Sequence, residues 1–211
     1  PNISNEIKEG VRHLFADRGL SSLLSGFIVV TFFMVPLAAL FPLITLNHFK
    51  GTTFQMGLVE VAWGVGMLLG GAILSIKYMK STNKVMIINI TAIIIGLAYW
   101  MSGMLPTTGF VIFAILTTIS GIAGSIYWSS FTVILQTKID PVALGRVFSI
   151  YDSISLLPTI PGLLATGFIA ERIGLTNAFI IAGLATLIVG IVAFMIPSVR
   201  RLGHSTKGVK E

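Results

Sequence analysis

Long apolar runs separated by short polar connections make up most of the chain. The runs lie at residues 22–46, 54–78, 84–104, 108–136, 142–170 and 177–197. Each is long enough to span a membrane, because an α-helix needs about 20 apolar residues to cross the hydrocarbon core of a bilayer. The connections carry turn residues, such as Asn47 with Gly51 and Pro106 with Gly109, so consecutive runs should be antiparallel. The pattern predicts an all-α integral membrane protein with six transmembrane helices.

The fifth run has an unusual mixture of residues for a plain lipid anchor. Asp140 suits a helix N-cap and Pro141 suits the first helical position, so one helix should begin here and continue to Ala170. Asp152 lies inside this apolar run. A polar residue at such a position favours a helix that packs against neighbours and lines a cavity.

The composition agrees with a membrane protein. Hydrophobic residues make up 55% of the chain and charged residues 10%, and the mean hydropathy is +0.94. A soluble domain of 211 residues could not bury so much apolar surface. The formal charge of +6 does not indicate nucleic-acid binding, because the basic residues lie in the connections, where they set topology. The chain has no cysteine for disulfides or thiolate ligands, and we expect neither a metal nor a cofactor.

The basic residues predict the orientation in the membrane. Most of them lie on the side of the N-terminus: Lys8, Arg12, Arg18, Lys77, Lys80, Lys84, Lys138, Arg146, Arg200, Arg201, Lys207 and Lys210. Only Lys50 and Arg172, of 14 basic residues, lie on the other side. Positive residues favour the cytoplasmic side, so we expect a plasma-membrane protein with both termini in the cytoplasm.

The two ends of the chain are polar and flank the predicted transmembrane domain of residues 19–199. Residues 1–18 have apolar positions on one helical face, which fits either an amphipathic helix at the membrane interface or a cytoplasmic linker. Residues 200–211 are predicted to be a cytoplasmic tail. The sequence starts at Pro1 without a cleavable signal, which suggests a piece of a longer polypeptide.

The fourth run carries a polar and aromatic stripe at helical spacing. Its members are Thr117, Gly121, Gly124, Trp128, Thr132 and Gln136. Such a stripe is expected to line a ligand-filled or aqueous space. The alternative is that the threonine hydroxyls bond back to the preceding turn. Asn89, in the third run, is either a further lining residue or a polar contact between helices.

Two carboxylates lie inside apolar runs, and they are the most costly residues to place in a membrane. Glu60 lies about two turns into the second run, and Asp152 about two turns into the fifth. A charge at this depth is by default a functional hypothesis, and we expect these acids to couple transport to protons. A structural pairing with a neighbouring helix is the alternative for each.

Small residues in the second run form two faces. Gly57, Gly64 and Gly71 recur every seven residues, whereas Gly66 and Gly70 are four apart. Small residues let helix backbones approach closely in a membrane, so both faces predict helix packing.

Prolines predict a bend in the first run, which Pro36 and Pro42 interrupt. Pro158 and Pro161 lie within the fifth run, which is predicted as one helix. Breaks of this kind are tolerated where other helices or water satisfy the freed carbonyls. We expect Pro158 and Pro161, together with Arg146 at the start of the fifth run, to take part in gating.

Four segments carry a resemblance to a known family. They are AALFPLITLNHFKGT (38–52), GVGMLLGGAIL (64–74), LQTKIDPVALGRVFSI (135–150) and GFIAERIG (167–174). The most specific part is Lys138, Ile139, Pro141, Leu144, Gly145, Arg146, Val147, Phe148 and Ser149. On these residues the chain resembles the C-terminal half of a major facilitator superfamily exporter, and more narrowly a drug:proton antiporter of the macrolide-efflux type.

The resemblance implies a fold and a mechanism. It implies one six-helix half of a twelve-helix transporter, with the N-terminal half of the same polypeptide as its partner. Proton-driven export of an amphiphilic small molecule by alternating access would follow, with the substrate site near the midplane between the halves.

Other classes of membrane protein fit the sequence less well. An intramembrane hydrolase needs a nucleophile with a buried base, but the histidines lie at or outside the ends of the runs and no G-x-S-x-G motif occurs, so the protein should not be an enzyme. No phosphate-binding G-x-x-x-x-G-K-[ST] motif occurs either. A self-standing six-helix channel or small permease remains the alternative.

Overall fold

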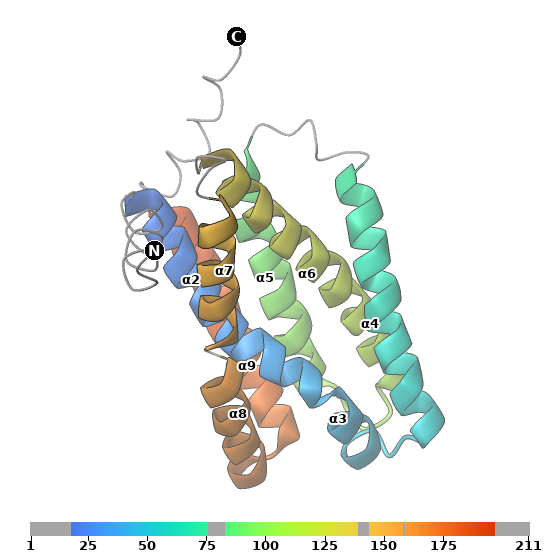
Figure 1. Cartoon of the computed structure of the whole chain (residues 1–211). Coiled ribbons are helices and arrows are strands. Elements are labelled where there is room, and N and C mark those ends of the chain that lie inside the picture. The colour runs from blue at the N-terminus through green and yellow to red at the C-terminus, as the bar shows by residue number, and fades with distance from the viewer. Residues whose placement is uncertain (1–17, 76–82, 139–143, 158, 197–211) are drawn as a thin grey trace.

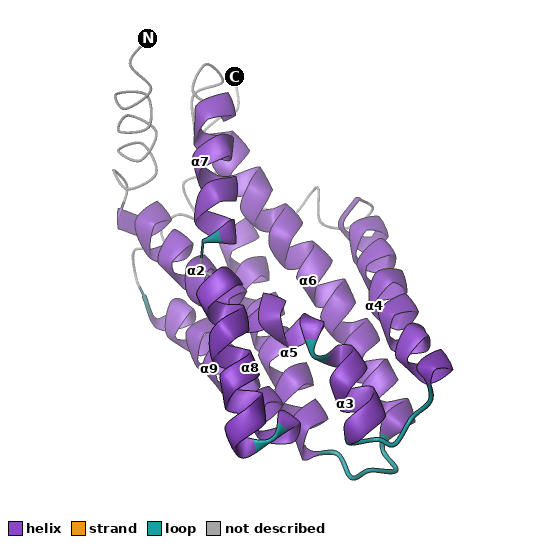
Figure 2. Cartoon of the chain, turned by 60° about the horizontal axis from the view of Figure 1, so that its bottom comes forward, coloured by secondary structure: helices purple, strands orange, loops and turns teal. Residues whose placement is uncertain are grey.

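The computed structural model describes residues 18–75, 83–138, 144–157 and 159–196, and all regular structure in these segments is helical (Figures 1 and 2). The helices are α2 (Arg18–Ala39), α3 (Phe41–Asn47), α4 (Thr53–Ile73), α5 (Lys84–Met104), α6 (Phe110–Lys138), α7 (Leu144–Leu156), α8 (Thr159–Ile173) and α9 (Leu175–Met195). The predicted all-α membrane fold is confirmed. Nearly all of residues 1–18 and all of residues 200–211 lie outside the described segments.

Helices long and apolar enough to cross a membrane occupy five of the six predicted runs. Within the described segments they are Ser21–Ala39, Thr53–Ile73, Lys84–Met104, Phe110–Thr137 and Leu175–Met195. Such lengths fit a bilayer, since a helix rises about 1.5 Å per residue and the hydrocarbon core is about 30 Å thick. The chain is a multi-pass membrane protein.

The fifth run differs from its sequence-based prediction, because two short helices replace the single helix that was expected. α7 has 13 residues and ends at Leu156, and α8 has 15 residues and begins at Thr159. The Leu157 N–H still donates to the Ser153 carbonyl, at 3.0 Å. The interruption precedes Pro158 in the sequence, and a residue before proline is driven out of the helical region by the proline ring.

The first run is also divided, and here the predicted bend is confirmed. α2 ends at Ala39, Leu40 separates it from α3, and Pro42 occupies the first turn of α3. Proline is well tolerated at that position because the first N–H groups of a helix have no partner within it. Pro36 lies inside α2, where its missing N–H removes one backbone hydrogen bond.

The helices pack pairwise and lie at different depths in the view of Figure 1. α5 packs on α9 and on α6, α6 packs on α4, and α2 packs on α8 and α9. In Figure 1, α5 and α9 lie at the back, whereas α7, α8, α3 and α4 face the viewer. The front face therefore presents the two divided runs and α4.

The two glycine faces of α4 have different environments. A Cβ atom at Gly66 or Gly70 would collide with the α6 backbone at Thr118 or Ile122. A Cβ atom at Gly57 or Gly64 would have nothing within 4 Å. One face thus holds α4 against α6 at close range. The other face is open at Gly57 and Gly64 within the described structure, whereas at Gly71 it meets the Ser125 hydroxyl at 3.8 Å.

Candidate functional site

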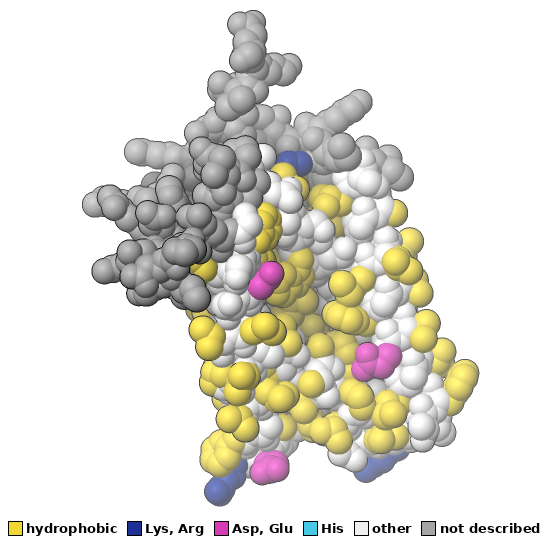
Figure 3. Space-filling model, in the orientation of Figure 1, with side chains coloured by type: hydrophobic (Ala, Val, Ile, Leu, Met, Phe, Trp, Pro, Cys, Tyr) yellow, Lys and Arg dark blue, Asp and Glu magenta, His cyan; other side chains and the backbone are white. Residues whose placement is uncertain are grey.

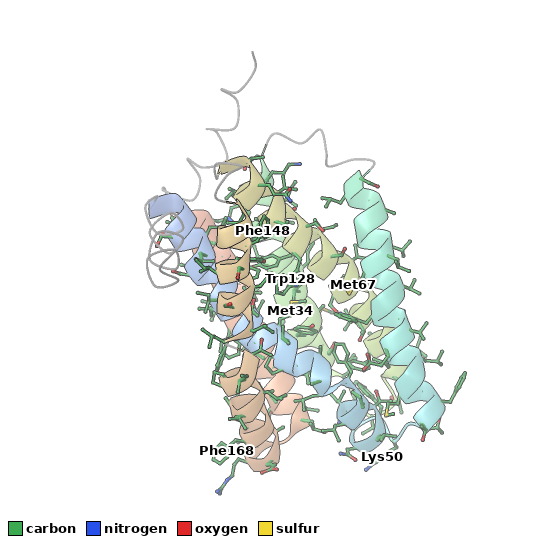
Figure 4. All side chains as sticks on the ribbon, viewed as in Figure 1. Met34, Lys50, Met67, Trp128, Phe148 and Phe168 are labelled. Atoms are coloured by element: carbon green, nitrogen blue, oxygen red, sulfur yellow. The ribbon has the colours of Figure 1, made fainter. Side chains whose placement is uncertain are left out.

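A cavity of about 280 Å³ lies where α2, α4 and α6 meet. Its lining residues are Met34, Val35, Ala38, Trp63, Met67, Gly124, Ser125 and Trp128. Figure 4 labels Met34, Met67 and Trp128 near one another in the middle of the view. The lining is apolar and aromatic, with one hydroxyl group, which is the usual composition of a binding site for an organic molecule.

Helical spacing brings these side chains to the cavity. Trp63 and Met67 are four residues apart on α4, and Gly124 and Trp128 are four apart on α6, so each pair shares one face of its helix. Gly121 has no side chain where α6 meets the α4 backbone at Trp63. This close contact between the two backbones places the lining residues of α4 beside those of α6.

An aromatic cluster adjoins the cavity at Trp128, and in Figure 4 Phe148 of α7 lies above Trp128. Phe27 lies at its centre, and its ring centroid is 4.8 Å from that of Trp128 and 4.4 Å from that of Phe131. The Phe27 ring also contacts Tyr151 of α7, at 5.2 Å. Edge-to-face and offset ring pairs of this kind stabilise a rigid arrangement. Trp128 is thus held in place on one side and exposed to the cavity on the other.

Carboxylates lie on the same face of the molecule as the cavity. Figure 3 shows acidic side chains over α7, over α4 and at the lower end of α8, with an apolar hollow between α7 and α4. The acids of these helices are Asp152, Glu60 and Glu171, and all are exposed. Among the described residues, neither Asp152 nor Glu60 has an ion-pair partner. No group of three or more potential metal-ligating side chains occurs in the described segments.

The structure places the predicted stripe of α6 in several environments. Trp128 and Gly124 line the cavity. The Thr117 hydroxyl is buried and donates to the Phe113 carbonyl at 2.8 Å. The Thr132 hydroxyl donates to the Trp128 carbonyl at 3.0 Å. These threonines therefore satisfy their hydroxyl groups within their own helix.

The other predicted lining residues lie away from this cavity. Gln136 is exposed, two residues before the end of α6. Asn89 is buried and borders a separate, narrow space between α2, α5, α6 and α9, beside Phe27 and Tyr127. Its position is that of a polar group between packed helices.

Two of the three predicted gate residues lie in the first turns of the two short helices. Arg146 is in the first turn of α7, and its side chain is outside the described part of the structure. Pro158 lies outside the described residues as well. Pro161 is exposed in the first turn of α8.

Several lining residues of the cavity were not predicted from the sequence, namely Met34, Val35, Ala38, Trp63, Met67 and Ser125. A signal was present for α4, because Glu60, Trp63 and Met67 recur at steps of three and four. No comparable signal marks the face of α2, because the residues around Met34, Val35 and Ala38 are almost all apolar.

The known proteins that are similar to this chain are described as membrane exporters. A family model described as transmembrane secretion effector matches residues 1–206. Macrolide efflux protein A of Streptococcus pyogenes is 35% identical over 204 residues, which cover 96% of this chain and 50% of that protein. The protein of the same name from Enterococcus faecalis is 36% identical over 165 residues, or 77% of this chain and 50% of that protein.

A more distant relative has a related description. Multidrug efflux pump Tap of Mycolicibacterium fortuitum is 27% identical over 205 residues, covering 95% of this chain and 48% of that protein. The chain therefore spans about half the length of the curated relatives that it matches.

Proposed function

Because the chain belongs to the transmembrane secretion effector family of major facilitator transporters, we propose that it forms one half of a proton-coupled exporter of amphiphilic drugs, macrolides among them. It is a transporter and not an enzyme, as the sequence predicted. The proposed exporter works by alternating access, with a substrate site between two six-helix halves.

The observation that carries the proposal is the cavity on the front face. It lies between α2, α4 and α6, where side chains of three helices converge on an apolar space. The open face of α4 at Gly57 and Gly64 leaves room beside it for another set of helices. Since the matched relatives are about twice as long as this chain, an N-terminal half of the same polypeptide is the proposed partner.

Proton coupling is assigned to the carboxylates of the front face. Asp152 is exposed on α7, next in sequence to Tyr151, which is buried in the aromatic cluster. In an exporter, a carboxylate that takes up a proton from outside and releases it to the cytoplasm would couple proton entry to drug exit. Asp152 is the proposed carrier, and Glu60 is the other acid at bilayer depth.

The orientation of the chain is part of the proposal. The excess of basic residues on one side supports cytoplasmic termini in the plasma membrane. In this orientation the upper end of Figure 1 faces the cytoplasm, and Arg146, in the first turn of α7, is proposed to take part in the inner gate.

The test is accumulation of a radiolabelled macrolide in susceptible bacteria that express the full transporter. Cells with the transporter should accumulate several-fold less drug than cells with an empty vector, and a protonophore should abolish the difference. Equal accumulation with and without the transporter, at verified membrane abundance, would rule out export of the drug. A difference that persists in the presence of the protonophore, with ATP depleted, would rule out proton coupling.

A further inference from the structure

We propose that a groove between α5 and α6 binds one acyl chain of a membrane phospholipid, whose phosphate group contacts Lys84 at the start of α5. The groove has a volume of about 190 Å³ and is lined by six isoleucines together with Thr91 and Ala123. The site goes beyond the proposed function and does not depend on it. It requires only that α5 and α6 cross the bilayer, as their length and composition indicate.

The groove lies on the side of α6 that is turned away from the cavity between α2, α4 and α6. Gly124 and Trp128 line the cavity, whereas Ala123 and Ile126 line the groove. Successive residues of an α-helix are rotated by about 100°, so the two sets of lining residues point to nearly opposite sides of α6. A drug bound in the cavity therefore does not occupy the groove.

The edges of the groove are open to the surroundings of the helix bundle. Ile90 of α5 and Ile119 of α6 are each 39% exposed, whereas Thr91 and Ala123 are buried beneath them. All of these residues lie within the two apolar spans. The medium that reaches the groove is therefore the hydrocarbon of the bilayer.

The lining of the groove selects an apolar occupant. Thr91 has the only polar side chain among the lining residues. Its hydroxyl donates to the Ile87 carbonyl at 2.8 Å and lies 3.0 Å from the Ile88 carbonyl, so the lining presents no unused side-chain donor. Water is not held in such a space, because a buried water needs two to four polar partners.

The dimensions of the groove fit a chain rather than a compact molecule. Its walls extend from Ile87 to Ile94 on α5 and from Ile119 to Ile126 on α6, which is about 10 Å along each helix. The hydrocarbon of one leaflet is about 15 Å thick. The volume is below the roughly 300–1,000 Å³ of pockets for drug-sized ligands. An acyl chain has the required length and width, and it restores the dispersion contacts that an empty groove would lose.

Lys84 supplies the charge that favours a phospholipid. Lys84 precedes Ile87 by three residues and Thr91 by seven, so it shares their side of α5. It is half-buried and lies about 4.5 Å from Ile87 along the helix axis. The headgroup layer adds about 5–7 Å to each side of the hydrocarbon, so the ammonium group is at the level of the phosphate when a chain fills the groove. An ammonium group has three donors and can bind a phosphate oxygen beside another partner.

An apolar side chain from another protein segment is the competing occupant. It would fill the groove equally well, but it would bring no negative charge to the level of Lys84. We favour the phospholipid because it complements both the apolar lining and the ammonium group, and because hydrocarbon already surrounds the open edges.

The test is lipid binding to the purified full transporter in detergent, measured by native mass spectrometry. The probes are palmitoyl-oleoyl phosphatidylglycerol and the diacylglycerol with the same chains, which has no phosphate. Ala123→Leu fills the groove and should raise the Kd of both lipids about tenfold. Lys84→Gln should raise the Kd of phosphatidylglycerol about tenfold, the loss expected for one charge-assisted contact, and that of diacylglycerol less than about twofold.

Matched controls separate the groove from other lipid-facing surfaces. Ala72→Leu adds the same atoms at an exposed position of α4 outside the groove, and Lys50→Gln removes an exposed charge after α3. Neither change should alter the Kd of either lipid. Because Ala123 is buried, a second groove variant is taken from the exposed edge: Ile90→Ala should raise the Kd of both lipids about threefold.

The outcomes that contradict the proposal are distinct. Unchanged Kd values in both Ala123→Leu and Ile90→Ala would overturn the groove as the site, and so would an equal effect of Ala72→Leu. An unchanged Kd of phosphatidylglycerol in Lys84→Gln would overturn the contact of the phosphate with Lys84. If the unaltered transporter bound neither lipid, a protein segment and not a phospholipid would occupy the groove.

Discussion

Gly162 of α8 packs directly against the carbonyl oxygen of Phe32 in α2. A Cβ atom built on Gly162 would lie 2.5 Å from that oxygen and 2.9 Å from the Cγ atom of Pro36. Pro36 has no N–H to donate to the Phe32 carbonyl, so the α2 helix is altered at the point where α8 crosses it. Helix α8, the second helix of the fifth run, thus packs on α2 within about one helical turn of the bend at Leu40.

We expect Gly162→Ala to destabilise the protein by about 1–3 kcal/mol, the usual cost of an added methyl group with no space to occupy. The measurement is the thermal unfolding midpoint of the purified protein in detergent. Gly167→Ala is the matched control, because Gly167 lies on the same helix and has nothing within 4 Å of its Cβ position. Equal midpoints for the two variants would mean that α8 does not dock on α2 as described.

The two glycine faces of α4 should respond differently to alanine. Gly66→Ala places a methyl group against the α6 backbone at Thr118, and we expect a loss of about 1–3 kcal/mol from overpacking. Gly64→Ala enters open space and should change stability by less than about 0.5 kcal/mol. Urea unfolding monitored by tryptophan fluorescence gives both values. A destabilising Gly64→Ala in the full transporter would place a helix of the partner half against this face.

Met67 should contribute to drug affinity through contact in the cavity. We expect Met67→Ala to weaken macrolide binding about tenfold. The truncation removes apolar contact between the Met67 side chain and the drug, which should contribute about 1–2 kcal/mol to the free energy of binding. Met86→Ala is the control, because Met86 is exposed on α5 and does not line the cavity. The readout is the Kd from equilibrium binding. If Met86→Ala weakened macrolide binding and Met67→Ala did not, the drug site would lie outside this cavity.

Asp152→Asn should separate drug binding from proton coupling. The amide keeps the shape of the side chain but carries no proton that it can release at working pH. We expect macrolide affinity to stay within about twofold and the pH-gradient-driven component of efflux to fall at least about tenfold. Everted vesicles with an imposed gradient supply the measurement. Unchanged gradient-driven efflux would assign Asp152 to structure and leave Glu60, or an acid of the partner half, as the carrier.

Arg146→Lys tests the inner gate. Arginine can bind a carboxylate or backbone carbonyls through its planar fork, whereas lysine offers only a point charge. We expect efflux to fall several-fold at equal membrane abundance, with the orientation of the chain unchanged because the positive charge remains. Full efflux in this variant would indicate that Arg146 serves only as a topology-setting charge.

The apolar pattern of the chain predicted the membrane class, the positions of the runs and the bend between Pro36 and Pro42. These features are local, because the length of an apolar run and the missing N–H of proline act within a few turns of helix. The short signature from Lys138 to Ser149 also indicated the family that the comparisons then confirmed. The break in the fifth run had a local signal as well, in Pro158, but the run was predicted as one helix.

The lining of the cavity was decided by the tertiary structure. From the predicted stripe, Trp128 and Gly124 reach the cavity, whereas the Thr117 and Thr132 hydroxyls are satisfied by their own helix. Met34 and Met67 join Trp128 only because α4 packs on α6 and side chains of α2 reach α6 at this level. In a membrane, lipid and neighbouring helices are equally apolar, so the pattern along a helix does not reveal which of its faces meets another helix. That choice depends on close backbone contacts, such as those at Gly66 and Gly162, which join residues far apart in the sequence.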